Sequence, residues 1–198
     1  TSPVYVPPAA GEHDPSNPVL VDNGATWSYR YEESAADEAW ASPDYDDSAW
    51  PRGAAPLGRG DDRIATNIQT SPRKTWPITS YFRTHFTVAD PSAISGVNVD
   101  FVADDGAVAY VNGAEVGRQR LGTGEVSYET RADAAPNYDA AQADRTTVFV
   151  PAARLVAGDN VLAVETHANY RKAKSVSMQA RVERVERKPG DNGSTTPP

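Results

Sequence analysis

The stretch from Val97 to Arg118 restricts the fold more than any other part of the sequence. Apolar residues at positions 97, 99, 101 and 103 alternate with Asn98, Asp100 and Val102. Alternation with a period of two residues is typical of a β-strand that buries one of its two faces. The stretch therefore predicts a strand with an apolar inner face and a largely polar outer face.

Two turn signals divide the same stretch. Asp105-Gly106 and Asn112-Gly113 both tolerate the positive φ angles that tight hairpin turns require. We therefore predict a three-stranded antiparallel meander across residues 97–118. A meander cannot bury its apolar face alone, so further strands must cover it.

Composition limits the class of protein. The chain has 198 residues, 39% of them hydrophobic, which suits one domain with one core. The net charge of −8 argues against sequence-independent binding to nucleic-acid phosphates. Because there are no cysteines, thiol catalysis, disulfides and cysteine-ligated metals are excluded. No apolar run is long enough to span a membrane.

Further strands are predicted on both sides of the meander, at residues 19–21, 27–31, 81–88, 146–150, 161–166 and 176–182. Residues 52–79 and 121–144 show no periodicity and are predicted to be long loops. Any helix is expected within a turn or two near residues 35–40. The residues predicted to share one core are Trp27, Phe82, Phe86, Phe101, Val111, Leu162 and Val164.

The ends of the chain differ in composition from its middle. Residues 1–18 are rich in proline and predict an extended lead-in, and residues 19–186 predict one β-sandwich domain. Residues 187–198 have the composition of a flexible linker. The linker predicts a further domain in the parent protein.

Several stretches together match a known family in order. They are Trp27 to Tyr29, Asp46 to Trp50, Ala55 to Gly58, Thr79 to Val88, Asp104 to Gly113 and Leu155 to His167. The chain resembles the galactose-binding-like jelly-roll domain appended to secreted bacterial hydrolases, and is similar to the sugar-binding domain of β-galactosidase-type glycoside hydrolases. The resemblance covers residues 19–186. It implies an all-β jelly-roll sandwich of about eight antiparallel strands, often with a structural calcium ion.

Strand order predicts which loops meet. If consecutive strands are antiparallel, loops 52–79, 104–106, 121–144 and 167–174 gather at one end of the sandwich, which we call end A. The opposite end receives only short turns, near Asp90, Asn112 and Gly158. Long loops on a rigid scaffold commonly carry binding groups, so we expect any ligand at end A.

The side chains expected at end A suit a carbohydrate. An aromatic ring stacks on the C–H face of a sugar, while carboxylate, amide and guanidinium groups bond its hydroxyls. The predicted ligand-binding residues are Trp76, Asp104, Asp105, Tyr128, Tyr138, His167, Asn169, Tyr170 and Arg171. The competing interpretation is that the aromatic residues only hold two long loops in place.

Catalytic and metal sites are less well supported. Asp104, Asp105 and Glu165 offer an acid/base pair, but Asp-Asp-Gly is more often turn chemistry. The three histidines lack the spacing of zinc ligands. Calcium needs six to eight oxygens, and the acidic loop residues available for it are Asp22, Asp44, Asp46, Asp47, Asp61, Asp62 and Glu165, with no ligand set assigned.

The sequence thus predicts a non-catalytic carbohydrate-binding accessory module of a secreted bacterial hydrolase. The alternative is a structural or adhesion spacer that positions a neighbouring catalytic domain without binding a small ligand. The expected partners are carbohydrate and that catalytic domain, with no nucleic acid and no membrane span. We expect a secreted, extracellular monomer.

Overall fold

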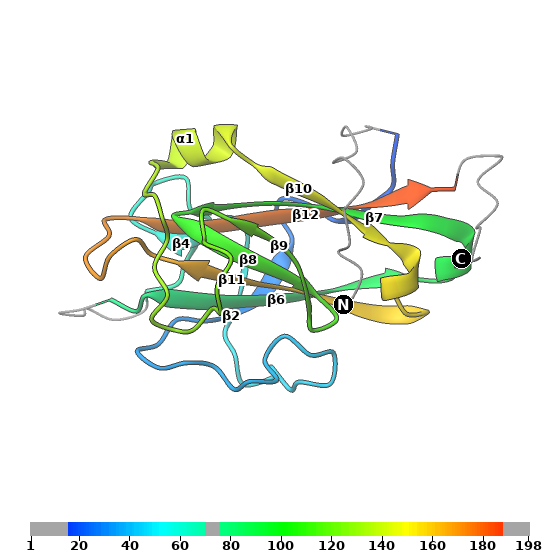
Figure 1. Ribbon diagram of the computed structural model, residues 1–198, viewed down its shortest axis with the longest axis horizontal. Helices are drawn as coiled ribbons and strands as arrows, with labels where there is room; N and C mark the ends of the chain where they lie inside the picture. Colours follow the sequence, from blue (N-terminus) through cyan, green and yellow to red (C-terminus); the bar gives the residue numbers. More distant parts are fainter. Residues whose placement is uncertain (1–15, 70–75, 188–198) are drawn as a thin grey trace.

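The chain folds into a β-sandwich, which a computed structural model describes for residues 16–69 and 76–187 (Figure 1). Sheet A contains, in spatial order, β10 (Thr146–Pro151), β7 (Ile94–Asp104), β12 (Val176–Glu186), β4 (Leu57–Arg59) and β5 (Thr66–Asn67), and β1 (Val19–Val21) also pairs with β12. Sheet B contains β3 (Arg52–Ala54), β2 (Thr26–Arg30), β6 (Thr79–Val88), β11 (Gly158–His167), β8 (Gly106–Val111) and β9 (Ala114–Gln119). Among the described strands, only the β4–β5 pair is parallel. The prediction of an all-β sandwich is confirmed.

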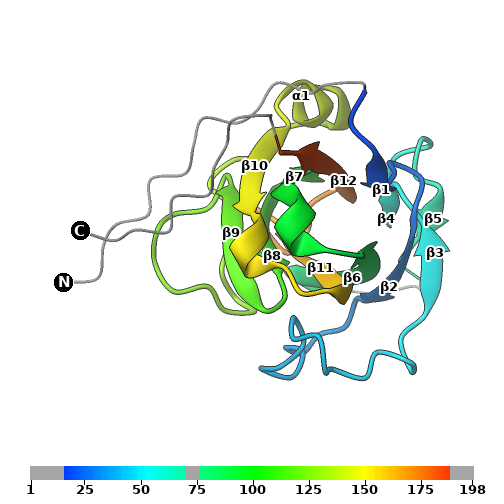
Figure 2. The ribbon, with the colours of Figure 1, turned by 90° about the vertical axis from the view of Figure 1, so that its right-hand side faces the viewer.

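The core lies between the two sheets (Figure 2). The alternating residues of β7, namely Val97, Val99, Phe101 and Ala103, are fully buried and face into it. All seven residues predicted to share one core belong to this cluster. Burial of each such side chain contributes about 1.5–3 kcal/mol, which makes this layer the main source of stability.

The predicted three-stranded meander is wrong. β8 and β9 form a hairpin through Asn112 and Gly113, which have φ angles of 50° and 82°. β7 and β8, in contrast, lie in different sheets, and the chain crosses the sandwich at Asp104 and Asp105. Gly106 does not form a hairpin turn. It lets the backbone lie close to Ala132, because a Cβ at this position would be 2.9 Å from the Cβ of Ala132.

Two other expectations differ from the structure. Residues 35–40 contain a turn at 38–40 but no helix. The described α-helix is α1 (Tyr138–Ala143), begun by the Asn137 side chain, which accepts a hydrogen bond from the N–H of Ala140. Single-turn 3-10 helices are η1 (Pro91–Ala93) and η2 (Ala152–Arg154). Residues 52–79, predicted to be one loop, contain β3, β4 and β5. These strands have two or three residues, too few to show a periodic pattern.

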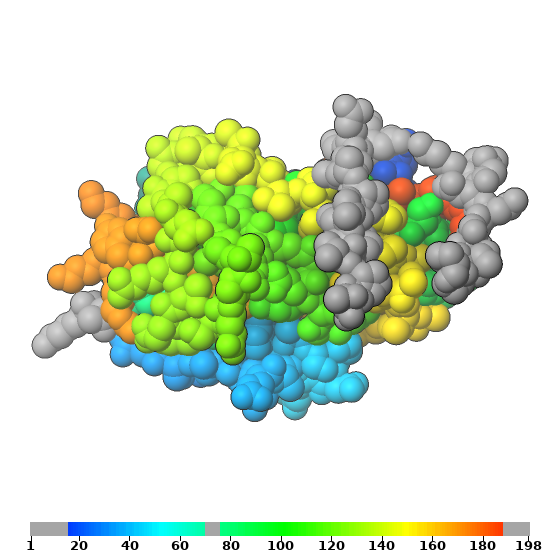
Figure 3. Space-filling view, viewed as in Figure 1, coloured from blue at the N-terminus to red at the C-terminus, as the bar shows by residue number. Residues whose placement is uncertain are grey.

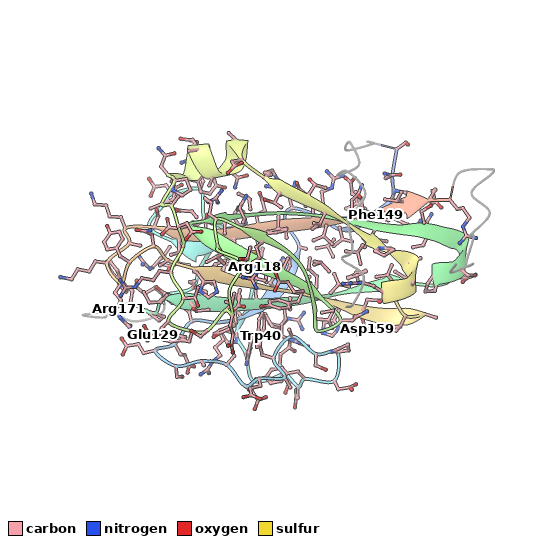
Figure 4. All side chains as sticks on the ribbon, in the orientation of Figure 1. Trp40, Arg118, Glu129, Phe149, Asp159 and Arg171 are labelled. Atoms are coloured by element: carbon pink, nitrogen blue, oxygen red, sulfur yellow. The ribbon has the colours of Figure 1, made fainter. Side chains whose placement is uncertain are left out.

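A second apolar layer covers the outer face of sheet B. Residues 31–51 run across that face, and Trp40 contacts Tyr81 and Tyr110 edge-on, with ring centroids 4.9 and 5.6 Å away (Figure 4). Arg83, fully buried in β6, donates to the carbonyl oxygens of Trp40, Ser42 and Tyr45 and to the Asp47 carboxylate. Trp50 packs half-buried against this second layer.

The predicted lead-in and linker lie almost entirely outside the described residues. Pro18, at the end of the lead-in, accepts a hydrogen bond from the N–H of Arg184 in β12 at 2.9 Å. Within the described residues, no helix has the length and apolarity needed to cross a membrane.

Candidate functional site

The strand register brings the predicted loops to one end of the sandwich. In sheet B, His167 at the end of β11 lies opposite Thr79 and Gly106. In sheet A, Asp104 pairs with Ser177 and Arg59 pairs with Val176. The loops before β6, between β7 and β8, after β9 and after β11 therefore meet at end A, on the left of Figure 1.

The Asp104–Asp105 corner is buried beneath these loops. The two residues are 1% and 2% exposed. The Asp105 carboxylate accepts a hydrogen bond from the N–H of Asn169 at 2.6 Å. The carbonyl oxygen of Asp105 accepts one from Nε of Arg120, also at 2.6 Å. Arg120 further donates to the carbonyl oxygen of Ala103 and pairs with Asp144 at 2.7 Å. The corner thus ties the loop after β9 to the loop after β11.

The Asp105 carboxyl resists ionisation. Burial, the largest cause, and the neighbouring Asp104 together raise its pKa to about 7. The hydrogen bond from the N–H of Asn169 lowers the pKa, but the effect of burial is larger. Two adjacent buried carboxyls cannot easily both carry charge, so this pair retains a proton under mildly acidic conditions.

His167 forms a second buried anchor. It is fully buried, and its Nδ1 lies 2.9 Å from the carbonyl oxygen of Thr130 and 3.2 Å from Oγ1 of Thr79. Because a carbonyl can only accept, Nδ1 donates to Thr130. Its Nε2 lies 3.3 Å from Glu165, whose other oxygen accepts the Tyr110 hydroxyl at 2.5 Å. Burial and the Glu165 charge raise the pKa of Tyr110 well above its usual range.

These anchors do not reach solvent. Asp104, Asp105 and His167 are predicted ligand-binding residues, yet at most 2% of each is exposed. A ligand at end A cannot contact them directly in this arrangement, and the same burial keeps a substrate from Asp104, Asp105 and Glu165. The contacts of Asp105 and His167 instead hold the loop segments around Thr130, Asn169 and Arg120 in place.

The exposed part of the predicted site lies on the loop after β11. The Tyr170 side chain is 45% exposed. Arg171 pairs with Glu129 of the loop after β9 at 2.6 Å, and both residues project from end A in Figure 4. Asn169 donates from its side chain to the carbonyl oxygen of Ala132 at 2.7 Å. Figure 3 shows these two loops side by side at the left end of the surface.

The remaining predicted aromatic residues are half-buried and engaged. Trp76 packs against the core, with the guanidinium carbon of Arg59 4.0 Å from its ring centroid. The Tyr128 hydroxyl donates to the carbonyl oxygen of Glu32 at 3.1 Å. Tyr138 lies at the start of α1 under Arg63, 4.2 Å from the ring centroid. Trp76 and Tyr138 each have one face occupied by an arginine.

The acidic side chains of the described residues are not gathered into one cluster. No group of three or more histidine, aspartate or glutamate side chains in the described ranges is arranged to hold a metal ion. Several of the acidic residues considered for calcium bond local donors instead: Asp22 accepts from Gly24, Asp46 from Ser48, Asp47 from Arg83 and Asp61 from Arg63. The calcium ion implied by the family resemblance stays a prediction.

Sequence reasoning missed the residues that organise end A. Arg120 has φ of 52°, in the left-handed region, and reaches back to the corner. Thr79 donates to the carbonyl oxygen of Tyr128 at 2.7 Å and joins β6 to the loop after β9. For Arg120 the sequence offered one signal, because an arginine directly follows a strand whose outer residues are polar. Nothing in the sequence marks Thr79, because its partner is a backbone oxygen far along the chain.

Comparisons with known proteins give structural likeness alone. No family model matches the sequence, and no curated protein does. A Bacteroides uniformis β-glucuronidase shares the fold with a TM-score of 0.56 and 15% identity, over 86% of this chain and 18% of that one. A β-glucuronidase from an uncultured Clostridium sp. matches with a TM-score of 0.55 and 12% identity, over 92% and 31%.

The matched chains are much longer than this one. A β-glucuronidase of glycoside hydrolase family 2 also matches, with a TM-score of 0.51 and 14% identity, over 86% of this chain and 18% of its own. At such identities the likeness shows the fold. The β-sandwich of this chain is therefore similar to one part of larger glycoside hydrolase chains.

Proposed function

We propose that this chain is a galactose-binding-like accessory module of a secreted bacterial hydrolase that binds carbohydrate through end A. The observation that carries the proposal is the loop after β11. It presents Asn169, Tyr170 and Arg171 at the surface while buried Asp105 holds its backbone. The likeness to parts of larger hydrolase chains supports a catalytic neighbour in the parent protein.

The chemistry of this loop suits a sugar. The 45% exposed Tyr170 ring offers an apolar face to the C–H groups of a pyranose. Arg171 and Glu129, already paired, offer a donor and an acceptor for hydroxyl groups. A loop that is ordered before binding loses less conformational entropy when a ligand arrives. Direct contact therefore falls to residues 169–171, with Trp76 and Tyr128 beside or beneath them.

A spacer module is the second candidate, and the burial of the corner favours it. Asp104, Asp105 and His167 are all buried away from solvent, and Arg59 covers one face of Trp76. On this alternative, end A is polar because it must hold two long loops together. The module would then position its catalytic neighbour through protein contacts.

The test is a glycan array on the full chain, followed by titration of any sugar that binds. A dissociation constant on the order of 10 µM to 1 mM is expected, because each net hydrogen bond contributes only about 1 kcal/mol. Tyr170→Ala and Trp76→Ala should each weaken binding about tenfold without unfolding the protein, because a stacked aromatic contributes about 0.5–1.5 kcal/mol beyond its buried area.

Val156→Ala is the matched control, since Val156 is 51% exposed at the opposite end. It should leave both binding and stability unchanged. If Trp76→Ala and Tyr170→Ala lower the melting temperature and leave binding unaltered, end A is a scaffold and the spacer function is favoured.

A further inference from the structure

A polar groove lies on the face of sheet A that points away from the core. It has a volume of about 230 Å³ and lies between β7, β10, β12 and the turn after β1. Its lining includes Asn23, Asn98, Asp100, Arg145, Thr147 and Arg181. Arg145 donates to Gln142 of α1 at 3.0 Å, so the groove lies beside that helix. Figure 2 shows α1 next to β10.

Strand register brings these polar residues together. Along β7, Asn98 and Asp100 alternate with the core residues, so their side chains point outward. Thr147 of β10 and Arg181 of β12 both lie opposite Asp100, and Glu183 lies opposite Asn98. Five polar residues from three neighbouring strands therefore share one small patch.

The walls of the groove are fixed by hydrogen bonds. Asp100 accepts from Nε of Arg145 at 2.5 Å and from the Thr147 hydroxyl at 3.0 Å. Arg145 also donates to Gln179 at 3.1 Å, and Gln179 donates to the carbonyl oxygen of Asn23 at 3.0 Å. A network of this kind holds the side chains in one arrangement before a ligand arrives.

The groove carries no net charge. Arg145 pairs with Asp100, and Arg181 pairs with Glu183 at 2.6 Å. Each charge in the lining is balanced by a neighbour, so an ionic ligand would gain little and would disturb existing pairs. The electrostatics favour a neutral ligand rich in hydroxyl groups.

Two groups in this ordered lining, on Asn98 and Arg181, lack a partner within the described part of the chain. Asn98 is 5% exposed, and its Oδ1 has no hydrogen-bond partner within the described part of the chain. Nε of Arg181 is likewise buried without a partner there. Leaving such a group buried and unpaired is energetically unfavourable. Both atoms lie just beneath the wall of the groove, where a small shift of the lining side chains would offer an acceptor and a donor to neighbouring hydroxyls of a sugar ring, which can both donate and accept.

We propose that this groove binds a terminal neutral sugar unit through Asn98 and Arg181. Its size suits a single ring, because sites for larger ligands usually measure about 300–1,000 Å³. An open hollow of about 510 Å³ shares Asn23 and Arg181 with the groove and leaves room for the following sugar unit. The inference rests on the carbohydrate class of the proposed function but assigns it to a different surface.

The experiment is a ¹H–¹⁵N NMR titration of the full chain with glucose, galactose and mannose as neutral probes and glucuronate as an anionic probe. Dissociation constants on the order of 1–10 mM are expected from two or three hydrogen bonds. At least one neutral sugar should shift the amide signals of residues 98–100, 147 and 181, and glucuronate should shift them less.

Asn98→Leu separates a binding role from a structural one. It should weaken binding about tenfold, because that factor corresponds to the loss of one hydrogen bond worth roughly 1.4 kcal/mol. It should leave the melting temperature unchanged or raise it, since an apolar group of similar size replaces an unpaired amide. Arg181→Lys keeps the charge but removes Nε, and should also weaken binding. Val156→Ala, at the end of the sandwich opposite end A, is the control and should leave the groove shifts intact.

Each outcome decides between the two surfaces. Shifts confined to end A would overturn the inference about the groove and leave the proposed function standing. Shifts confined to the groove would support the inference and reject end A as the binding surface. No shift at either surface with any neutral sugar would overturn both. Equal binding by Asn98→Leu, or a preference for glucuronate, would also overturn the inference.

Discussion

At the scale of the residue, Asp105 is a carboxyl whose ionisation the fold opposes. Burial and the neighbouring Asp104 raise its pKa from 3.8 to about 7. Between these values the folded protein holds a proton that the unfolded chain has lost. Stability must therefore fall as the pH rises through this window, by up to about 1.4 kcal/mol per pH unit from this group. Below the window both states are protonated and the effect disappears.

Asp105→Asn should remove this dependence. The amide oxygen can still accept the N–H of Asn169, but the side chain no longer titrates. We expect the melting temperature of the variant to change less than that of the wild type between about pH 5 and pH 8, with the variant the more stable at the higher value. Asp133→Asn, at an exposed position of the same end, is the control. Parallel pH profiles for all three proteins would contradict this assignment.

At the scale of the element, the strands were predictable and their neighbours were not. The alternation at Val97, Val99 and Phe101 is local, so the sequence identifies the buried face of β7 correctly. Asp105-Gly106 has the composition of a hairpin turn, but the following strand finds its partners in the other sheet. That choice depends on β11 and β12, which lie more than fifty residues further along the chain.

The candidate site was predictable in part, for the same reason. Antiparallel order places Asp104, Asp105 and His167 at one end, but order carries no information about depth beneath the loops. The groove on sheet A was missed although its signal was present. Asn98, Asp100 and Arg181 occupy the outward positions of two strands, and only the register shows that those strands are adjacent.

The loop over sheet B depends on one arginine. The Arg83 side chain is 0% exposed. It donates hydrogen bonds to three carbonyl oxygens and to the Asp47 carboxylate. Arg83→Met should lower the free energy of unfolding by about 3–5 kcal/mol, as expected when a buried ion pair loses one partner. Arg83→Lys should not rescue it, because an ammonium lacks the planar fork of donors.

Urea denaturation measures both effects. Arg184→Met is the matched control, because Arg184 pairs with Glu186 at the surface, where such pairs contribute about 0–1 kcal/mol. A loss below about 1 kcal/mol for Arg83→Met would show that residues 40–47 hold their position without the guanidinium.

At the scale of the whole molecule, each sheet is completed by a strand from late in the chain, β11 in sheet B and β12 in sheet A. β12 lies between β7 and β4 and also pairs with β1, so it joins three strands of sheet A. A chain ending at residue 175 should therefore fail to fold cooperatively, while one ending at residue 187 should keep the circular dichroism spectrum and melting temperature of the full chain. Cooperative unfolding of the shorter chain would show that sheet B is stable by itself.

The position of β12 has a consequence for synthesis on the ribosome. Every strand of sheet B is translated by His167, whereas β7 and β4 wait for residues 176–186 before they can be joined. A nascent chain therefore spends an interval with the edge of β7 unpaired and one side of the core open. Such edges pair readily with other chains, so this interval is when aggregation competes most strongly with folding. A chaperone that binds the emerging polypeptide would act most usefully before β12 leaves the exit tunnel.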